Sequence, residues 1–410
     1  MSLESTIVHG SFFLLACAAA TVLLLLLLIT RVRLHPALAL VIAALGLGVA
    51  SGMPLSQVPL SFSAGVGNLM GHIAIVLALG AVLGRLLASS GGATTLGRAL
   101  VEKCGPKGLP WALLALGILV GMPVFFEVGL VLLLPIVAAT AERNHRPPIL
   151  VAMPLLAGLS IVHCTLPPHP AAMLAVTQYH ADLGRTILWG LVVGLPAAAL
   201  AGPGLGWLMT LRWEKQALQA CGGSGAEDAT NTNAASAVGE TPVEEERVAE
   251  LPSLQSVILA GEGSTPGNHS APAGPFLAAS AILLPVALIF LGSWADALAA
   301  RRGIANQILH FIGTPEVALL IAVLVALVTL GGHLQSGHHH GRELLRKLTG
   351  ESFEPIANVL VILAAAGGLS GILRDSGAAQ ATVGLALGAS IPPLLLAWLM
   401  AAVVRVSTGS

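Results

Sequence analysis

Long apolar runs follow one another along this chain of 410 residues, separated by short polar or basic stretches. Runs of about 20 apolar residues have the length that an α-helix needs to cross a bilayer. The runs are continuously apolar and do not alternate, which excludes a membrane β-barrel. The pattern therefore predicts an all-α polytopic membrane protein. The predicted spans lie near residues 12–30, 37–50, 66–87, 187–209, 275–292, 316–330, 355–373 and 381–404.

Two further apolar stretches, 111–140 and 149–177, are interrupted by polar and helix-breaking residues. The first contains Gly121-Met-Pro-Val-Phe-Phe-Glu-Val-Gly129, and the second contains His163-Cys-Thr-Leu-Pro-Pro-His-Pro170. Ionisable groups and broken backbone are costly in lipid, so they are expected only where protein or a water-filled cavity surrounds them. We interpret the two interruptions as the floor of a transport site.

Basic residues flank the stretch 111–140 on both sides, in the segments 98–107 and 142–146. Because basic loops favour the cytoplasmic side of a membrane, both flanks are expected on that side. A single crossing cannot begin and end on one side, so the pattern favours a re-entrant hairpin that turns near Gly121–Pro123. An ordinary proline-kinked span, with one loop assigned to the wrong side, remains the alternative.

Prolines are concentrated in the stretch 149–177, where Pro167, Pro168 and Pro170 lie close together. A helix interior tolerates such a cluster poorly, because proline lacks an N–H group and its ring clashes with the preceding turn. We expect a discontinuous helix, with a half-helix to about Val162, an unwound middle and a short second half.

The composition changes in the middle of the chain, where residues 217–273 are rich in Gly, Ser, Ala, Asn, Thr and Glu. Such a composition is typical of a disordered segment. The sequence therefore predicts an N-terminal transmembrane half, 1–211, and a disordered cytoplasmic linker, 212–273. A C-terminal transmembrane half, 274–410, follows and is expected to be incomplete.

A sequence repeat relates the two halves, because the segment 78–92 resembles 364–378. The charge distribution gives the spans that lead into these two segments opposite directions across the membrane. Two halves of opposite orientation are the signature of an inverted-repeat secondary transporter. Continuing the alignment places 124–128 on 406–410, where the sequence stops, so a C-terminal truncation is expected.

The composition supports a membrane protein and excludes several other classes. Hydrophobic residues make up 55% of the chain and charged residues 10%, whereas a soluble domain carries about a quarter charged residues. The four cysteines have no paired spacing, so neither a disulfide framework nor a zinc site is predicted. The chain has no Gly-x-Ser-x-Gly, phosphate-binding or His-Glu-x-x-His motif. We expect no enzyme, no cofactor and no bound metal.

The two interruptions, 125–129 and 163–170, resemble the signatures of the gluconate permease family of proton symporters. Weaker glycine-rich matches elsewhere extend the resemblance over most of the chain except 217–273. The resemblance implies a multi-pass protein of a bacterial cytoplasmic (inner) membrane that imports gluconate or a related sugar acid or hydroxy acid with protons. The implied partners are a small organic anion, the proton and the lipid bilayer, with no nucleic acid; a homo-oligomer is left open. The competing interpretation is a sodium-coupled carboxylate transporter of similar architecture.

Proton coupling requires a group that exchanges protons near neutral pH. Glu127 is the first candidate, because ionisable groups within membrane segments are usually functional. The alternative role of Glu127 is a structural carboxylate that accepts hydrogen bonds from N–H groups at a helix start. His163 and His169 are the next candidates, because imidazole titrates in the required range.

Substrate binding is assigned to the same two interruptions. The carboxylate of a sugar acid is expected at half-helix N-termini, where free N–H groups and the helix dipole favour an anion. Thr165, His163 and His169 are expected to bind its hydroxyl groups. Phe125 and Phe126 are expected either to line the sugar face or to pack in the core.

Overall fold

The computed structural model describes most of the chain as helix. Every regular element among the described residues is helical, as the continuous apolar runs predicted. The described residues are 3–124, 126–144, 146–210, 272–299, 303–331, 341–388, 392, 394–395, 397–398 and 401–402.

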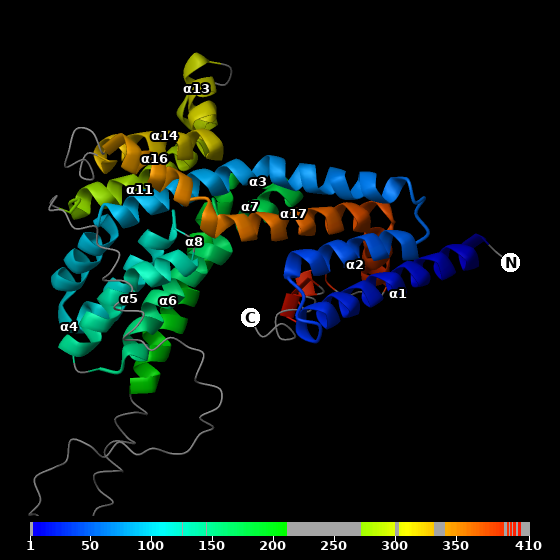
Figure 1. The fold of residues 1–410 in the computed structure, drawn as a ribbon, viewed down its shortest axis with the longest axis horizontal. Coiled ribbons are helices and arrows are strands. Elements are labelled where there is room, and N and C mark those ends of the chain that lie inside the picture. The colour runs from blue at the N-terminus through cyan, green and yellow to red at the C-terminus, as the bar shows by residue number, and fades with distance from the viewer. Residues whose placement is uncertain are drawn as a thin grey trace, which may run out of the picture. The chain divides into compact units, whose positions relative to one another are not determined.

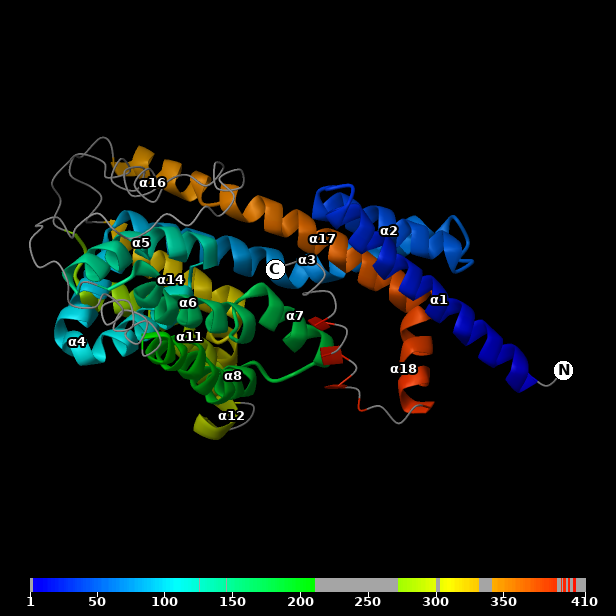
Figure 2. The same ribbon diagram turned by 90° about the horizontal axis from the view of Figure 1, so that it is seen from below.

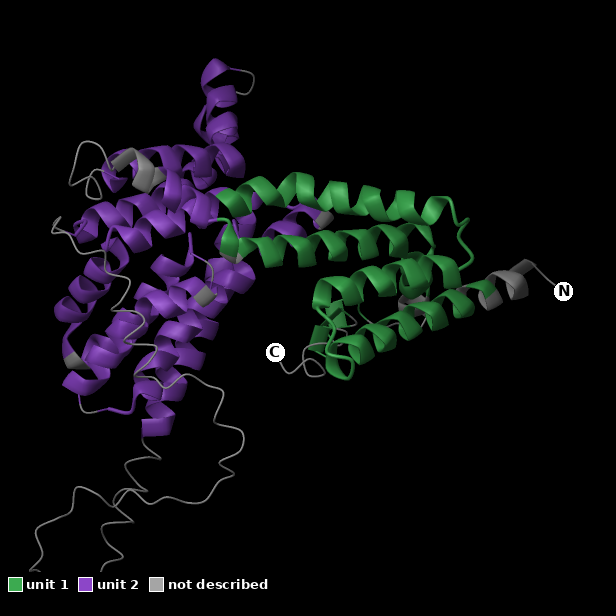
Figure 3. Ribbon diagram, in the orientation of Figure 1, with its two compact units in different colours: residues 1–78, 353–410 green, residues 79–352 purple. Residues whose placement is uncertain are grey.

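The helices form two compact units, coloured separately in Figure 3. Unit 1 combines the two ends of the chain, residues 1–78 and 353–410, and unit 2 contains residues 79–352. The chain passes from one unit to the other within α3 (Gln57–Ser89) and again between Ser352 and Phe353. The predicted halves, 1–211 and 274–410, divide the chain differently and stay a prediction.

Unit 1 is built from helices at opposite ends of the sequence (Figure 1). The second helix, α2, packs against both α1 and α17, and α1 also packs against α18. The core includes Ala44, Leu47, Val58 and Ile372, all buried. Besides the first part of α3, the unit contains α1 (Leu3–Thr30), α2 (Pro36–Ala50), α17 (Glu354–Asp375) and α18 (Ala378–Gly388).

Glycines bring α3 and α17 close together in unit 1. A Cβ atom on Gly371 would meet the carbonyl oxygen of Ser61 and lie 3.0 Å from the Cα atom of Gly65. A Cβ atom on Gly368 would overlap the ring of Phe62. The sequence pattern placed the span at 66–87, but α3 begins nine residues earlier, at Gln57. The extra helical turns are accounted for by this packing, since Ser61, Phe62 and Gly65 all contact α17.

Unit 2 contains the interrupted segments and the helices around them. The eighth helix, α8, packs against both α6 and α11 (Figure 2). After the end of α3 the unit contains α4 (Gly92–Gly121), α5 (Phe126–Arg143), α6 (Pro148–Thr165), α7 (Pro170–Tyr179), α8 (Leu183–Ala199) with a π-helical turn (Leu200–Gly204), α11 (Pro275–Ser293), α12 (Ala295–Leu298), α13 (Ile304–Ile312), α14 (Pro315–Thr329) and α16 (Gly341–Glu351).

Six helical segments among the described residues are long and apolar enough to cross a membrane. The count rises to seven if α13 and α14, which meet at an angle of 74°, form one broken span. One of the six is the pair α6–α7, residues 148–177. The prediction of an all-α polytopic membrane protein is thereby confirmed. The last predicted span, 381–404, is described only in part, and its first residues belong to the helix that ends at Gly388.

The two segments of the sequence repeat have the same local structure. In each, a helix ends at a serine and a glycine with positive φ, and the next helix starts at once: Gly91 has φ 69° and Gly377 has φ 78°. Ser90 Oγ donates to the carbonyl of Leu87, and Ser376 Oγ donates to that of Leu373. This match supports the repeat locally, and its inverted orientation stays a prediction.

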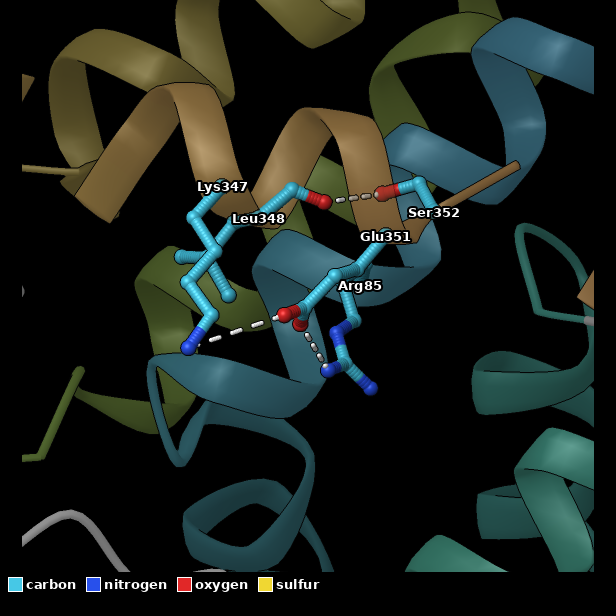
Figure 4. Close-up of polar contacts among 5 residues, drawn as sticks. All are labelled: Arg85, Lys347, Leu348, Glu351 and Ser352. Carbon is cyan, nitrogen blue, oxygen red and sulfur yellow. Dashed lines mark hydrogen bonds and ion pairs between the residues drawn. The ribbon is translucent and has the colours of Figure 1, made fainter. Parts of the chain in front are cut away.

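An ion pair in unit 2 joins α3 to α16 (Figure 4). Arg85 Nη2 lies 2.9 Å from Glu351 Oε2, although the two residues are 266 positions apart in the sequence. Lys347 Nζ lies 3.8 Å from the other oxygen of Glu351. The side chains are about two-fifths exposed, so the pair adds little stability and mainly fixes α16 beside α3.

The predicted linker, 212–273, lies outside the described residues except at its end, where the chain rejoins unit 2. Ala273 N donates to the carbonyl of Ser90 at 3.0 Å, and Thr95 Oγ1 donates to the carbonyl of Ala273 at 2.6 Å. These bonds attach the chain that enters α11 to the start of α4.

Candidate functional site

The first interruption is the tip of a helical hairpin formed by α4 and α5. A Cβ atom on Gly97 would lie 2.9 Å from Leu116 Cδ2 and 2.6 Å from Ile136 Cδ1. A straight helix would separate Leu116 and Ile136 by about 30 Å, so the chain reverses between them. The break between Gly121 and Phe126 is that reversal. The chain therefore reverses near Gly121–Pro123, as predicted, and the placement of both hairpin ends on one side of the membrane stays a prediction.

A second reversal, which the sequence did not suggest, divides α4. Gly97 and Leu116 would lie about 28 Å apart in a straight helix, yet they are in contact. The helix bends back at Gly105, whose φ of 63° and ψ of −177° are not helical. Arg98, Lys103 and Lys107, which resembled a basic loop, are thus part of a helical bend.

The second interruption is a broken helix, as predicted. The first half, α6, continues to Thr165, three residues beyond the expected end at Val162. Leu166 has an extended backbone, with φ −108° and ψ 127°, and the Pro167–Pro168 peptide bond is cis. The second half, α7, begins at Pro170.

The interruption is held in the core of unit 2. Leu166 packs with Val162 of α6, Ile187 of α8, Ile289 of α11 and Ala318 of α14, and all five side chains are buried. Apolar packing from four helices therefore surrounds the broken backbone, which satisfies the condition that such a break should be enclosed by protein.

His169 connects the two interruptions. Its side chain is 5% exposed, and its Nε2 atom lies 2.7 Å from the carbonyl oxygen of Gly121, the last residue of α4. A carbonyl only accepts, so Nε2 carries the hydrogen of this bond. The end of a helix leaves such carbonyls without an intrahelical donor. The imidazole of His169 thus satisfies the end of α4 and attaches the hairpin tip to the break.

The second candidate histidine, His163, lies beside His169. The centroids of the two rings are 4.8 Å apart, and their planes are inclined at 54°. Both rings therefore occupy the place where the hairpin tip and the broken helix meet.

The remaining candidates are distributed around this place. Thr165 faces α8, because a Cβ atom on Gly194 would lie 3.4 Å from its Oγ1 atom. Its hydroxyl donates to the carbonyl of Ile161 at 2.6 Å, which leaves its oxygen lone pairs as acceptors. Phe126 is the first residue of α5 and is partly buried. Glu127 is the second residue of that helix, but its side chain, like all of Phe125, lies outside the described part of the structure.

A groove next to the break contains polar residues that the sequence analysis did not select. It has a volume of about 550 Å³ and lies between α7, α8 and the end of α6. Asp182, Arg185 and Thr186 line it together with Thr165. An Asp three residues before an Arg at a helix start resembles an ordinary capped helix end, so the pattern gave no functional signal. Within the described part of the chain, no three His, Cys, Asp or Glu side chains gather closely enough to hold a metal ion.

Comparisons with known proteins agree with this architecture. The GntP family permease model matches residues 13–243 and 246–410. A gluconate permease of Pseudomonas aeruginosa is 38% identical over 93% of this chain and 76% of its own length. The Gnt-II system L-idonate transporter of Escherichia coli is 32% identical over 91% of this chain and 75% of its own length.

A third relative has a different named cargo. The D-serine transporter DsdX of Escherichia coli is 30% identical over 93% of this chain and 76% of its own length. No solved structure matches the chain. The family match and these identities settle the class of the protein. The chain belongs to the GntP family of permeases, multi-pass proteins of the cytoplasmic membrane, and it is a transporter and not an enzyme.

Proposed function

We propose that this permease imports gluconate or a related sugar acid by proton symport. The observation that carries the proposal is the junction of the hairpin tip and the broken helix through His169 and Gly121, with His163 beside it. The relatives named for gluconate and L-idonate transport support a sugar acid as the cargo.

The ends of the half-helices provide the binding chemistry in this proposal. The carboxylate is bound near the starts of α5 and α7, where free N–H groups and the helix dipole favour an anion. Thr165, His163 and His169 bind hydroxyl groups of the substrate. Phe125 and Phe126 lie against its carbon chain, and Phe126 is the first residue of α5.

Glu127, His163 and His169 are the proposed proton-coupling residues. Each belongs to one of the two interruptions, and His169 is bonded to a backbone carbonyl of the other. A proton gained or lost at this junction therefore changes the attachment between the hairpin and the broken helix. Substrate binding at the same junction would then depend on the proton, which is the requirement for symport.

Uptake into membrane vesicles tests the coupling ion. Vesicles that contain the permease should accumulate labelled gluconate when a proton gradient is imposed in the absence of sodium, and a protonophore should abolish the accumulation. Accumulation driven by a sodium gradient alone would favour the competing sodium-coupled transporter. Uptake that never exceeds equilibrium under either gradient would exclude symport.

Substitutions identify which residue carries the proton. Among Glu127→Gln, His163→Gln and His169→Gln, the variant that lacks the proton carrier should lose accumulation while exchange of labelled for unlabelled gluconate persists. His72→Gln is the matched control, because His72 makes only a local bond to the carbonyl of Asn68 on an exposed helix surface. A Glu127→Gln variant that still accumulates gluconate under a pH gradient would remove Glu127 from the coupling mechanism.

A further inference from the structure

The groove beside the break is lined by the end of α6, by an apolar wall from α7 and by a partly polar wall from α8. The floor is the end of α6, at Cys164 and Thr165. The α7 wall consists of alanines, whose small side chains leave the groove open, and the α8 wall carries Arg185, Thr186 and Trp189. The volume of about 550 Å³ lies within the range of small-molecule sites.

Local hydrogen bonds hold the start of α8 in place and leave the guanidinium group of Arg185 available. Asp182 Oδ1 accepts from the backbone N–H of Arg185 at 2.7 Å, and Thr186 Oγ1 donates to the carbonyl of Asp182 at 2.8 Å. Among the described residues, no ion pair involves Arg185, whose side chain is exposed. Asp182 is therefore used as a helix cap, and the positive charge of Arg185 has no assigned partner in the described structure.

The lining matches the chemistry of a small hydroxy acid. A guanidinium group binds a carboxylate with two parallel hydrogen bonds. Thr165 and Thr186 each donate their hydroxyl hydrogen to a backbone carbonyl, so their oxygen atoms accept hydrogen bonds from substrate hydroxyls. The indole of Trp189, which is 64% exposed, offers an apolar surface for the carbon chain.

The named cargoes of the relatives differ in length and in their amino group but share one feature. Gluconate, L-idonate and D-serine all carry a carboxylate and at least one hydroxyl group. A groove suits all three molecules if a guanidinium group binds the carboxylate and threonine hydroxyls bind the hydroxyl groups of the substrate.

We infer that this groove, which we name the α7–α8 groove, binds the substrate next to the break, with Arg185 binding its carboxylate beside the start of α7, which lines the same groove at Ala171 and Ala172. The inference rests on the proposed function, because it requires a carboxylate cargo. Substrate held in the groove contacts Thr165, the last residue before the broken backbone, and is therefore placed beside the proposed coupling site.

Cys164 provides a direct test of occupancy, because this free thiol is exposed and lines the groove. In a variant that keeps only Cys164, gluconate should slow the reaction of the thiol with N-ethylmaleimide, and the uncharged polyol sorbitol should not. A variant that keeps only Cys104 is the matched control, since Cys104 is exposed beside the bend of α4, away from the groove.

Arg185 is tested in the same assay and in transport. Arg185→Gln should abolish the protection of Cys164 by gluconate and raise the KM for gluconate by about tenfold to a hundredfold, the effect of losing a charge-assisted hydrogen bond. Arg185→Lys should fall between Arg185→Gln and the unmodified protein, because lysine keeps the charge but not the two-pronged geometry. Arg146→Gln, which removes an exposed arginine elsewhere in unit 2, should leave both readings unchanged.

The outcomes separate the two proposals. If the unmodified permease transports gluconate, but gluconate does not protect Cys164 and Arg185→Gln leaves the KM unchanged, the groove is not the binding site and the proposed function stands. If the unmodified permease shows neither transport nor protection with gluconate, while its elution on size exclusion shows a folded protein, the sugar-acid proposal itself is wrong.

Discussion

His169 lies among three prolines, at a point where few backbone groups can donate hydrogen bonds. Its imidazole makes the bond to Gly121 that the surrounding backbone cannot make. The same side chain is therefore a structural attachment and a candidate for proton exchange. A measurement of protein stability distinguishes these two roles, because the bond to Gly121 stabilises the fold whether or not protons are transported.

Replacing His169 by alanine should lower the free energy of unfolding in detergent by about 1–3 kcal/mol, because the buried carbonyl of Gly121 loses its donor. His72→Ala, which removes a local bond on an exposed helix surface, should change it by less than about 0.5 kcal/mol. Thermal unfolding followed by circular dichroism measures both variants. Equal stability of the two would show that the attachment contributes nothing.

Sequence reasoning selected His163, His169 and Thr165 as candidates because polar residues within an apolar segment stand out. It did not identify the groove around Arg185 or the ion pair of Arg85 with Glu351, and the reason is physical. Both arginines are near helix ends, where an exposed charge costs little and carries no signal. What distinguishes them is their surroundings, a groove in one case and Glu351 in the other, and these arise only when distant segments pack.

At the scale of the helices, the position of the hairpin depends on where α4 crosses α6. A Cβ atom on Gly158 would lie 2.5 Å from the carbonyl oxygen of Leu114 and 2.9 Å from the N atom of Ile118. On the facing helix, a Cβ atom on Gly117 would meet the carbonyl of Leu155. The two backbones are thus in direct contact, and this contact places the hairpin tip against the break.

Gly158→Ala should therefore separate the two helices, lower stability by about 1–3 kcal/mol and reduce uptake. Gly46→Ala is the control, because no atom lies within 4 Å of a Cβ at Gly46 and alanine is favoured in a helix interior by up to about 1 kcal/mol. Unfolding in detergent and vesicle uptake measure the pair. A Gly158→Ala variant as active and stable as Gly46→Ala would exclude the close crossing.

The sequence predicted the hairpin and the broken helix because charge, proline and hydrophobicity each act locally. It did not predict the bend at Gly105, where a basic segment was expected to be a loop and is helical on both sides. The length of α3 was underestimated for a related reason. Its first turns contain Gln57, Ser61 and Ser63, whose polarity suggests a loop until the packing of Ser61 against α17 is known.

At the scale of the whole molecule, unit 1 joins segments from both ends of the chain. The predicted halves were divided at the linker because the amino-acid composition changes there. Composition indicates which segments are exposed to solvent, but it does not indicate which helices pack together. The match between Ser90-Gly91 and Ser376-Gly377 shows that local sequence similarity does predict local conformation. The pairing of α3 with α17 is a property of the folded chain, and it can be tested directly.

The pairing of α3 with α17 brings Leu69 next to Gly367. A Cβ atom on Gly367 would lie 2.9 Å from Leu69 Cβ, so a shift of about 1 Å would give the separation of about 3.8 Å found in disulfides. With the four native cysteines replaced by serine, Leu69→Cys with Gly367→Cys should form a disulfide under mild oxidation.

The disulfide is detected on a non-reducing gel. After cleavage at a protease site introduced between residues 212 and 271, the two fragments should remain joined. Leu69→Cys with Gly384→Cys should release them, because no atom lies within 4 Å of a Cβ at Gly384. Equal release from both pairs would mean that the first and last parts of the chain do not form one unit.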